Sequence, residues 1–544
     1  MYLISKEKDT LPKGLRPFKN ILHFRTALVL VLLFFMANLF SLMQFPLVHS
    51  DEIWLKGLSL EVWHQRSFNV TEPFYDLYPR VPHPFRWLFN LLQLGFVGIF
   101  GNSLFSVRLL SLVASTSSLI VFYKILRHIT KSEALSLSGL SLLMLNIQWL
   151  YAAHFGRQEA LIMLLMLLSY WNCTRLNSTK WLALILLLGI GIHPNSFLIG
   201  FMICLLLCHQ IYHKMRPLRD FFVFIGITMV GCIIYLGSGF LMTSDFLMRY
   251  LSFGASLGVD AVPMSRLQNY YWFWVKLYGE IGGTYELFNI RIELCLLAIL
   301  VLVVPFIPKV ISKQTLLNRS DADSHLFDAI HLFEPYIALV SILLGLFIIG
   351  RNNQTSVVFL LPFVILMLFN LVSIFNLKKQ WRMGFSIGIT LFALFNLQGD
   401  LKAYTARFPY AQPYEVIQRE IGKAIPHDAA VLGNINIMEG QNTNQFYDIR
   451  NLAYLQENNL TLQDYIDRRH IQYIAIHDEM DYIASCSPKW DFLYVNMNYW
   501  DELNDYLTAN TELISEIDNP LYAMRISKYA GTYPWKTKIY RILP

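Results

Sequence analysis

Residues 27–52, ALVLVLLFFMANLFSLMQFPLVHSDE, contain a run of about 20 apolar residues that stops just before two adjacent acids. An apolar helix of that length crosses the ~30 Å hydrocarbon core of a bilayer. The run is too long for the core of a signal peptide and lacks a small-residue cleavage site, so we expect 27–46 to remain as the first spanning helix. Asp51 and Glu52 then lie where the chain leaves the membrane.

The composition extends this reading to most of the chain. Of the 544 residues, 55% are hydrophobic and only 15% are charged, whereas soluble domains carry roughly 25% charged residues. Apolar stretches of similar length recur and are apolar on all sides, which favours spanning helices over barrel strands. The net charge of +6 comes with basic residues grouped in short loops, which is typical of cytoplasmic anchors and not of nucleic-acid binding. The six cysteines indicate no disulfide framework. The sequence therefore predicts an α-helical polytopic membrane protein.

The distribution of Lys and Arg predicts the orientation. The first 25 residues are rich in Lys and Arg, which places the N-terminus in the cytoplasm and the acidic pair outside. We expect about eleven spans, alternating with basic inner loops. They lie near 27–46, 104–123, 134–153, 158–174, 181–192, 221–243, 292–307, 333–350, 356–376 and 384–398, with a further span between 192 and the basic segment 213–220.

Two domains are expected. Residues 1–399 form a transmembrane catalytic domain with a large first outer loop, 47–103. Residues 400–544 are polar and alternate helix with strand, as in YEVIQREIGKAIPHDAAVLG (414–433) and LQDYIDRRHIQYIAIH (462–477), with KIYRIL (538–543) as a last strand. This pattern predicts a small extracytoplasmic α/β domain.

The first outer loop begins with an amphipathic piece at 52–63. Its apolar residues fall on one helical face, with Glu52, Lys56 and Ser59 across from them. This pattern predicts an amphipathic helix.

Polar residues gather at the outer ends of the predicted spans. A carboxylate there can serve as a general base, and Arg or His can hold an anionic phosphate. The candidates are Asp51, Glu52, His83, Arg86, His154, Arg157, Glu159, His193, Asn195, Arg351, Asn352 and Gln354.

Each candidate also has a plainer interpretation. A lone charge after a span is usually a solvated helix end, and His154 is better read as a packing residue. Asp51 could merely cap the helix that follows, a role that Asn would fill equally well. Arg157 and Glu159 are more telling, because they lie in a tight turn between apolar runs, where unpaired charge is expensive.

No spacing of ligands predicts a metal site, and no Gly-rich loop predicts nucleotide binding. Asp51 and Glu52 could bind a divalent cation together with Glu159, but no cofactor is required by the pattern.

The acidic pair, the segment HPFRWLFNLLQLGFVGIFGNSLFSVRLLSLVASTSSLIVFYKILRHI (83–129), GRQEAL (156–161) and GIHPNSF (191–197) resemble the C-type glycosyltransferases (GT-C) of the protein-mannosyltransferase and aminoarabinose-transferase superfamily. The resemblance covers roughly residues 25–200, and beyond that it is one of architecture. It implies a donor of the polyprenyl-phosphate-sugar type, an inverting transfer to a lipid, protein or glycan acceptor, and a location in a bacterial plasma membrane.

The resemblance also implies roles for the candidates. Asp51 would be the base that deprotonates the acceptor, and Glu52 and Glu159 would orient the acceptor or the base. The lipid phosphate would be held by His83, Arg157, His193 and Arg351, although His83 and His193 stand where many relatives carry other residues.

Two other classes remain open from the residues. A transporter or flippase for lipid-linked sugars usually shows polar or Gly/Pro-broken spans and internal repeats, whereas here the charges gather at one face. A structural protein without catalysis would not need the cluster of acids, Arg and His.

Overall fold

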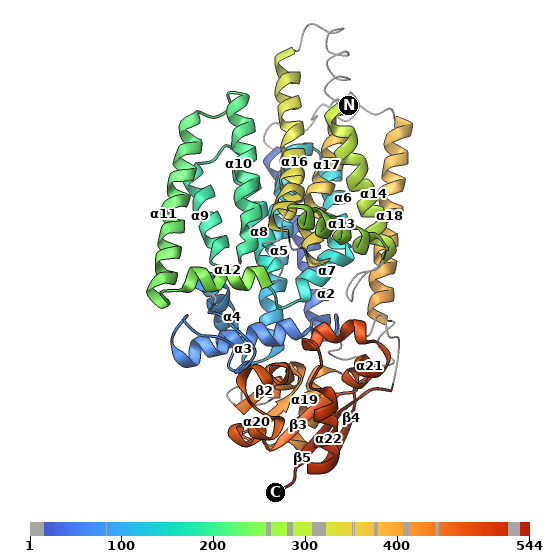
Figure 1. Ribbon diagram of the computed structural model, residues 1–544. Helices are drawn as coiled ribbons and strands as arrows, with labels where there is room; N and C mark the ends of the chain where they lie inside the picture. Colours follow the sequence, from blue (N-terminus) through green and yellow to red (C-terminus); the bar gives the residue numbers. More distant parts are fainter. Residues whose placement is uncertain are drawn as a thin grey trace. The chain divides into compact units, whose positions relative to one another are not determined.

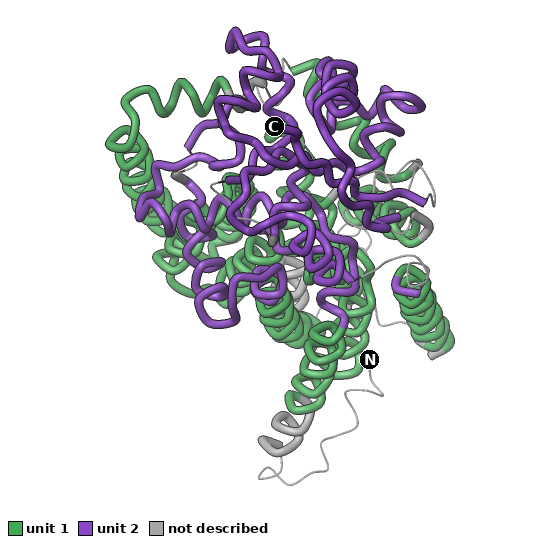
Figure 2. The backbone as a smooth tube through the Cα atoms, turned by 90° about the horizontal axis from the view of Figure 1, so that it is seen from below, with its two compact units in different colours: residues 1–40, 111–154, 158–403 green, residues 41–110, 155–157, 404–544 purple. Residues whose placement is uncertain are grey.

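A computed structural model describes residues 16–82, 84–256, 263–279, 287–306, 322–350, 352, 354–374, 379–405, 413–440, 445–520 and 534–544. The chain forms two compact units (Figure 2). Unit 1 comprises 1–40, 111–154 and 158–403, and unit 2 comprises 41–110, 155–157 and 404–544. Unit 2 thus joins the C-terminal stretch to the first outer loop and to a three-residue segment from the middle of the chain.

Unit 1 consists of helices (Figure 1). They are α2 (Arg16–Ser41), the later part of α5 (Leu104–Thr130), α6 (Glu133–Met144), α7 (Ile147–His154), α8 (Glu159–Thr174), α9 (Thr179–Ile190), α10 (Phe197–Tyr212), α11 (Leu218–Met242), α12 (Phe246–Ser256), α13 (Pro263–Gly279), α14 (Leu287–Val303), α16 (Ala322–Ile349), α17 (Leu361–Ile374) and α18 (Lys379–Thr405). Each predicted span coincides with one of these helices or with a pair of them.

Among the described residues, six helices are long and apolar enough to cross a membrane, or seven if α6 and α7 form one span. Shorter apolar helices occur at 159–174, 179–190 and 333–349 in unit 1. The chain is therefore an integral membrane protein, and the number of about eleven spans stays a prediction.

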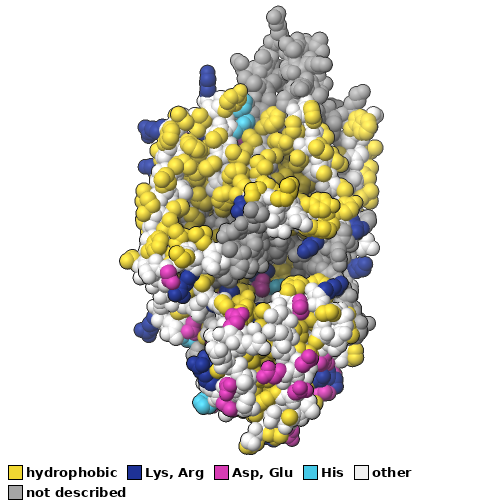
Figure 3. Space-filling model, viewed as in Figure 1, with side chains coloured by type: hydrophobic (Ala, Val, Ile, Leu, Met, Phe, Trp, Pro, Cys, Tyr) yellow, Lys and Arg dark blue, Asp and Glu magenta, His cyan; other side chains and the backbone are white. Residues whose placement is uncertain are grey.

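The outward surface of unit 1 fits this conclusion. Hydrophobic side chains cover much of the helical surface in view (Figure 3). On α11, Phe222, Met229, Val230, Ile233 and Ile234 are all more than half exposed. Such a surface is compatible with lipid, which has no polar groups to satisfy it.

The segment 134–153, predicted as one helix, is broken. α6 and α7 meet at an angle of 62°. Asn146 lies at the break, and its Oδ1 accepts hydrogen bonds from the backbone N–H groups of Gln148 and Trp149 at 2.9 and 3.2 Å. Asn favours such a helix start because its side chain replaces the missing intrahelical acceptor. The Asn146 amide also donates to the buried carboxylate of Glu293 on α14.

Unit 2 is built around a five-stranded sheet of order β2-β1-β3-β5-β4 (Figure 1). The strands are β1 (Val431–Gly433), β2 (Phe446–Asp448), β3 (Tyr473–His477), β4 (Thr511–Asp518) and β5 (Lys536–Ile542). β1 is parallel to β2 and β3, and β5 is antiparallel to β3 and β4. The predicted small C-terminal sheet is confirmed, including its helix–strand order of α19 (Tyr414–Ala424), β1, α20 (Leu462–Arg469) and β3.

The two faces of the sheet enter different cores, because successive strand residues point to opposite sides. Leu432, Ile474 and Ile476 pack into a cluster with residues of α20 and α22 (Trp500–Asn510). Ala475 and Ile539 face a second cluster, to which α19, the outer loop and α3 (Ser50–Gln65) contribute. The first outer loop is therefore part of the core of the C-terminal sheet.

We expect Gly433→Ala to destabilise the protein. A Cβ at Gly433 would lie 2.6 Å from the backbone oxygen of Ala475 on the paired strand, where nothing can move aside without disturbing the sheet. The cost should be about 1–3 kcal/mol. Gly422→Ala is the matched control, because its Cβ meets nothing within 4 Å and alanine suits a helix better than glycine. Thermal unfolding of the purified full-length protein measures both, and equal melting temperatures for the two variants would contradict the expectation.

Candidate functional site

The acidic pair lies in the first turn of α3, whose N-terminus is fixed by a residue that sequence reasoning passed over. His49 is the N-cap, and its Nδ1 accepts a hydrogen bond from the backbone N–H of Asp51 at 3.1 Å. Glu52 completes a capping box, since its Oε2 accepts from the His49 N–H at 2.9 Å. Asp51 is therefore not the helix cap, and its carboxylate is available for another role.

Glu52 is wholly enclosed. Its carboxylate receives two hydrogen bonds of 2.9 Å from the Arg108 guanidinium, and both side chains are 0% exposed. Its Oε1 also accepts from the backbone N–H of Gly156 at 2.8 Å. A Cβ at Gly156 would lie 2.9 Å from Cγ2 of Val107 and 3.5 Å from Oε1 of Glu52, so glycine keeps this backbone close to the carboxylate. Glu52 thus holds three chain segments together.

Arg108, besides binding Glu52, also bonds the backbone that follows the first helix, α2. Its Nη1 donates to the carbonyl oxygens of Leu42 and Pro46 at 2.8 and 3.2 Å. The signal that could have identified it is its place in the apolar run FSVRLLSL, since a charge there needs a partner.

The side chain of Asp51 is more exposed than that of Glu52. Its Oδ2 accepts a hydrogen bond of 2.9 Å from Nη1 of Arg157, and the two side chains are 27% and 12% exposed. The structure therefore brings together two candidates that are 106 residues apart in the sequence. The pair offers a carboxylate and a guanidinium side by side, one for a proton and one for an anion.

The polar side of α3 is buried. Lys56 is 3% exposed and bonds Glu439, while Ser59 is 1% exposed and donates to Oε1 of Gln93 at 2.6 Å. Gln93, on α4 (Trp87–Phe100), in turn donates to the carbonyl of Gly156 at 3.3 Å. The predicted helix at 52–63 is present, and its polar residues bond other parts of unit 2.

The outer loop is fixed by a second buried ion pair. Glu72 accepts hydrogen bonds from Arg80 at 2.8 and 2.9 Å and from the Trp54 indole. The Arg80 guanidinium lies 4.5 Å from the centre of the Trp54 ring. Burial by itself lowers the pKa of Arg80, but Glu72 outweighs it and the net pKa is raised. Arg80 therefore keeps its positive charge, and its guanidinium lies against Trp54 of α3.

Of the remaining candidates, Glu159 and His193 belong to unit 1. In unit 1, Glu159 begins α8 and accepts from the Thr355 hydroxyl at 3.1 Å. His193 is an N-cap whose Nδ1 accepts from the Asn195 N–H at 3.1 Å. His83 and Arg351 lie outside the described residues.

His154 is a packing residue, as expected. It is 0% exposed, and its ring nitrogens lie 2.9 and 3.2 Å from the carbonyl oxygens of Leu150 and Asn38. Among the residues that the structure describes, no group of three or more His, Cys, Asp or Glu is arranged to hold a metal ion.

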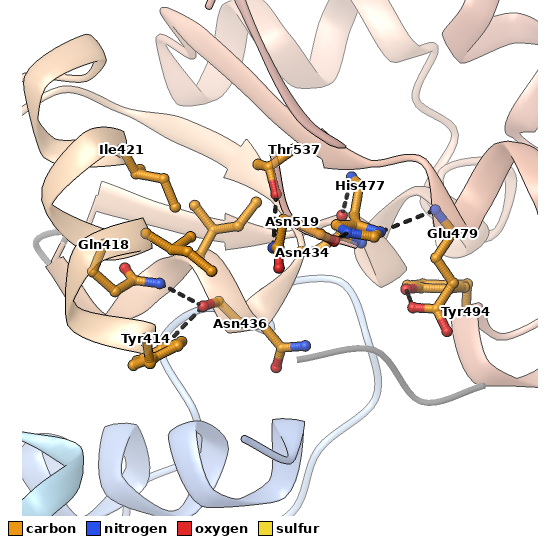
Figure 4. Close-up of a pocket in the computed structure, with 12 residues that line it drawn as sticks. Tyr414, Gln418, Ile421, Asn434, Asn436, His477, Glu479, Tyr494, Asn519 and Thr537 are labelled. Atoms are coloured by element: carbon orange, nitrogen blue, oxygen red, sulfur yellow. Dashed lines mark hydrogen bonds between the residues drawn. The ribbon is translucent and has the colours of Figure 1, made fainter. Parts of the chain in front are cut away.

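A separate recess lies at the carboxyl ends of β1 and β3 (Figure 4). It holds about 370 Å³ of empty space, including its open mouth, and its lining contains neither Lys nor Arg. His477 accepts from the Glu479 N–H at 3.0 Å, and its Nε2 lies 2.9 Å from the Asn519 carbonyl. Burial lowers the pKa of His477. Because Nδ1 accepts a hydrogen bond and the Asn519 carbonyl can only accept, Nε2 is the nitrogen that donates. These polar groups bond one another, and the recess lacks the cations that a phosphate site needs.

Comparisons with known proteins agree with the resemblance inferred from the sequence. Residues 82–242 match the family model described as dolichyl-phosphate-mannose-protein mannosyltransferase. The matched segment overlaps residues 25–200, on which the resemblance seen in the sequence rests. A search of the curated proteins finds no match.

Solved structures of other proteins have a fold similar to that of this chain. The fold is similar to that of ArnT from Cupriavidus metallidurans bound to undecaprenyl phosphate, with a TM-score of 0.54 and 10% identity over 96% of this chain and 98% of that chain. The apo state of the same ArnT gives a TM-score of 0.53 with 11% identity over the same shares. The predicted fold class, a helical membrane protein of GT-C type with a small C-terminal sheet, is confirmed.

We expect Glu52→Gln to destabilise the protein strongly, because it leaves the charge of Arg108 buried without a counter-ion. Breaking a buried pair in this way typically costs 3–5 kcal/mol. The double variant Glu52→Gln/Arg108→Met strands no charge and should recover most of the lost stability. Thermal unfolding in detergent measures both variants. A single variant as stable as the double one would show that the pair does not hold the site together.

Proposed function

We propose that this protein is a membrane glycosyltransferase that moves a sugar from a polyprenyl-phosphate-linked donor to an acceptor hydroxyl on the outer side of the membrane. The observation that carries the proposal is the partly exposed Asp51–Arg157 pair on the enclosed Glu52–Arg108 support. The match to the mannosyltransferase model supports it, and so does the fold shared with ArnT, which was crystallised with undecaprenyl phosphate.

In the proposed reaction Asp51 is the general base. Its carboxylate takes the proton of the acceptor hydroxyl as the hydroxyl oxygen attacks the anomeric carbon of the donor sugar. The bond between that carbon and the phosphate oxygen breaks, and the lipid phosphate leaves with the electron pair. Attack opposite the leaving group inverts the anomeric carbon. Glu52 orients Asp51 without touching the substrate, since its oxygens bond Arg108, His49 and Gly156.

Arg157 has a double role in this proposal. Its planar guanidinium carries five N–H donors and suits a phosphate. The same guanidinium bonds Asp51. A bound phosphate would compete for the guanidinium and weaken its hold on Asp51, so that the base is released when the donor is in place. His83, His193 and Arg351 are proposed as further phosphate contacts, and Glu159 as an orienting group.

We expect Asp51→Asn to lose about 10²–10⁴-fold in turnover, the usual contribution of a general base. Asn keeps the size of the side chain, and His49 still caps α3, so the melting temperature should not change. The assay follows lipid phosphate released by reconstituted protein from a polyprenyl-phosphate sugar, with the glycosylated product identified by mass spectrometry. Wild-type turnover in Asp51→Asn would overturn the mechanism.

Arg157→Gln is the companion variant. It should raise the KM for the donor more than it lowers kcat, because the guanidinium acts on the phosphate. The same assay tests the alternative class, since a flippase would move the lipid-linked sugar across the membrane without releasing lipid phosphate.

The orientation is part of the proposal. The alternation of basic loops places the N-terminus in the cytoplasm, and the acidic pair and residues 400–544 outside. Cysteines introduced at exposed positions such as Asn69 or Glu457 should react with an impermeant maleimide in intact cells, with the native cysteines replaced. Labelling that needs permeabilised cells would reverse the topology.

A further inference from the structure

The short helix η6 (Ile435–Gly440) of the C-terminal stretch reaches the same two helices that Glu52 and Arg108 join. The Glu439 carboxylate accepts a hydrogen bond of 2.6 Å from Nζ of Lys56 on α3. Its other oxygen accepts a bond of 2.9 Å from the backbone N–H of Leu104, the first residue of α5. One carboxylate from the C-terminal stretch thus ties α3 to α5.

The two ties lie one helical turn apart. Lys56 follows Glu52 by four residues on α3, and Leu104 precedes Arg108 by four residues on α5. Residues spaced by four lie on the same helical face, so the α3–α5 contact is fixed at two successive levels. Two contacts between α3 and α5 restrict the rotation and tilt of α3 more than a single contact would. Asp51 is adjacent to Glu52 and its direction depends on that orientation.

Charge and burial make this second tie costly to break. Lys56 is 3% exposed and Glu439 is 12% exposed at the side chain, so neither charge is well solvated without the other. The Leu104 N–H belongs to the first turn of α5, where backbone donors lack intrahelical partners. A carboxylate there also interacts favourably with the helix dipole.

A glycine of α3 lies where η6 approaches the helix. A Cβ at Gly57 would lie 2.9 Å from Cε of Met438 and 2.8 Å from Cε1 of Phe74. Met438 and Phe74 belong to one apolar cluster with Ile53 of α3. The residue beside Glu439 is therefore packed against α3 by apolar contact, which places the carboxylate on Lys56.

We propose that Glu439 is a positioning residue for the transfer reaction, which it serves by holding α3, and with it Asp51, in a productive orientation. The C-terminal stretch is then a working part of the catalytic unit and not only a place where an acceptor could bind. This inference rests on the proposed function, in which Asp51 is the base.

The decisive variant is Lys56→Met/Glu439→Gln. It leaves no charge stranded, and Gln can still accept from the Leu104 N–H, so the melting temperature should stay near that of the wild type. The tie to α3 is gone, however, and small misplacements of a catalytic group reduce turnover on the order of 10²-fold. We expect that loss in kcat with the donor KM nearly unchanged, measured on reconstituted full-length protein. Wild-type kcat in this variant would overturn the inference.

Two controls separate positioning from stability. Lys56→Arg keeps a cationic donor for Glu439 and should retain kcat within a few-fold, and a loss equal to that of the double variant would count against the tie. Thr461→Ala removes the N-cap of α20, in another part of unit 2, and should lower the melting temperature without lowering kcat. Equal losses of kcat in Thr461→Ala and the double variant would assign the effect to stability and overturn the inference.

Asp51→Asn distinguishes the two levels of the argument. If Asp51→Asn is inactive and the double variant is fully active, the positioning role fails and the proposed function stands. If Asp51→Asn is fully active, the proposed function itself fails, whatever the Glu439 variants show.

Discussion

The buried ion pair between Glu52 and Arg108 is the constraint on which the candidate site depends. Removing two charges from water is expensive, and the attraction between them offsets that expense only when the remaining donors and acceptors are also bonded. Here the peptide N–H groups of His49 and Gly156 donate further hydrogen bonds to the carboxylate. Backbone carbonyls near the end of α2 accept the remaining hydrogen bonds of the guanidinium. The pair therefore joins four separate stretches of unit 2 at one point.

Asp51 and Glu52 are adjacent in the sequence but differ in exposure, because only Glu52 is enclosed with Arg108. Because Glu52 is fully bonded and 0% exposed, it cannot exchange a proton with a substrate without dismantling its surroundings. Asp51, one residue earlier on the helix, points to a partly exposed place and meets Arg157. A rigid neighbour and a reachable carboxylate are together what a preorganised general base requires.

The fold of unit 2 makes sense of the buried polar face of α3. Glu52, Lys56 and Ser59 each bond a different segment, namely α5, η6 and α4. These bonds do for α3 what water does for an ordinary amphipathic helix. The apolar side of the helix packs into the same cluster as the C-terminal sheet, so both faces of α3 are committed to unit 2.

The sequence by itself determined the membrane class, the positions of the helices and the helix–strand order near the C-terminus, because length, hydrophobicity and period are local properties. It also named Asp51 and Arg157 as candidates, and the structure shows that their side chains are bonded to each other. Only the tertiary structure decided which acid is enclosed, that His49 and not Asp51 caps α3, and that α6 and α7 are separate helices. For the enclosed acid the physical reason is distance along the chain: Arg108 and Gly156 lie 56 and 104 residues from Glu52, and no local pattern specifies partners so far apart.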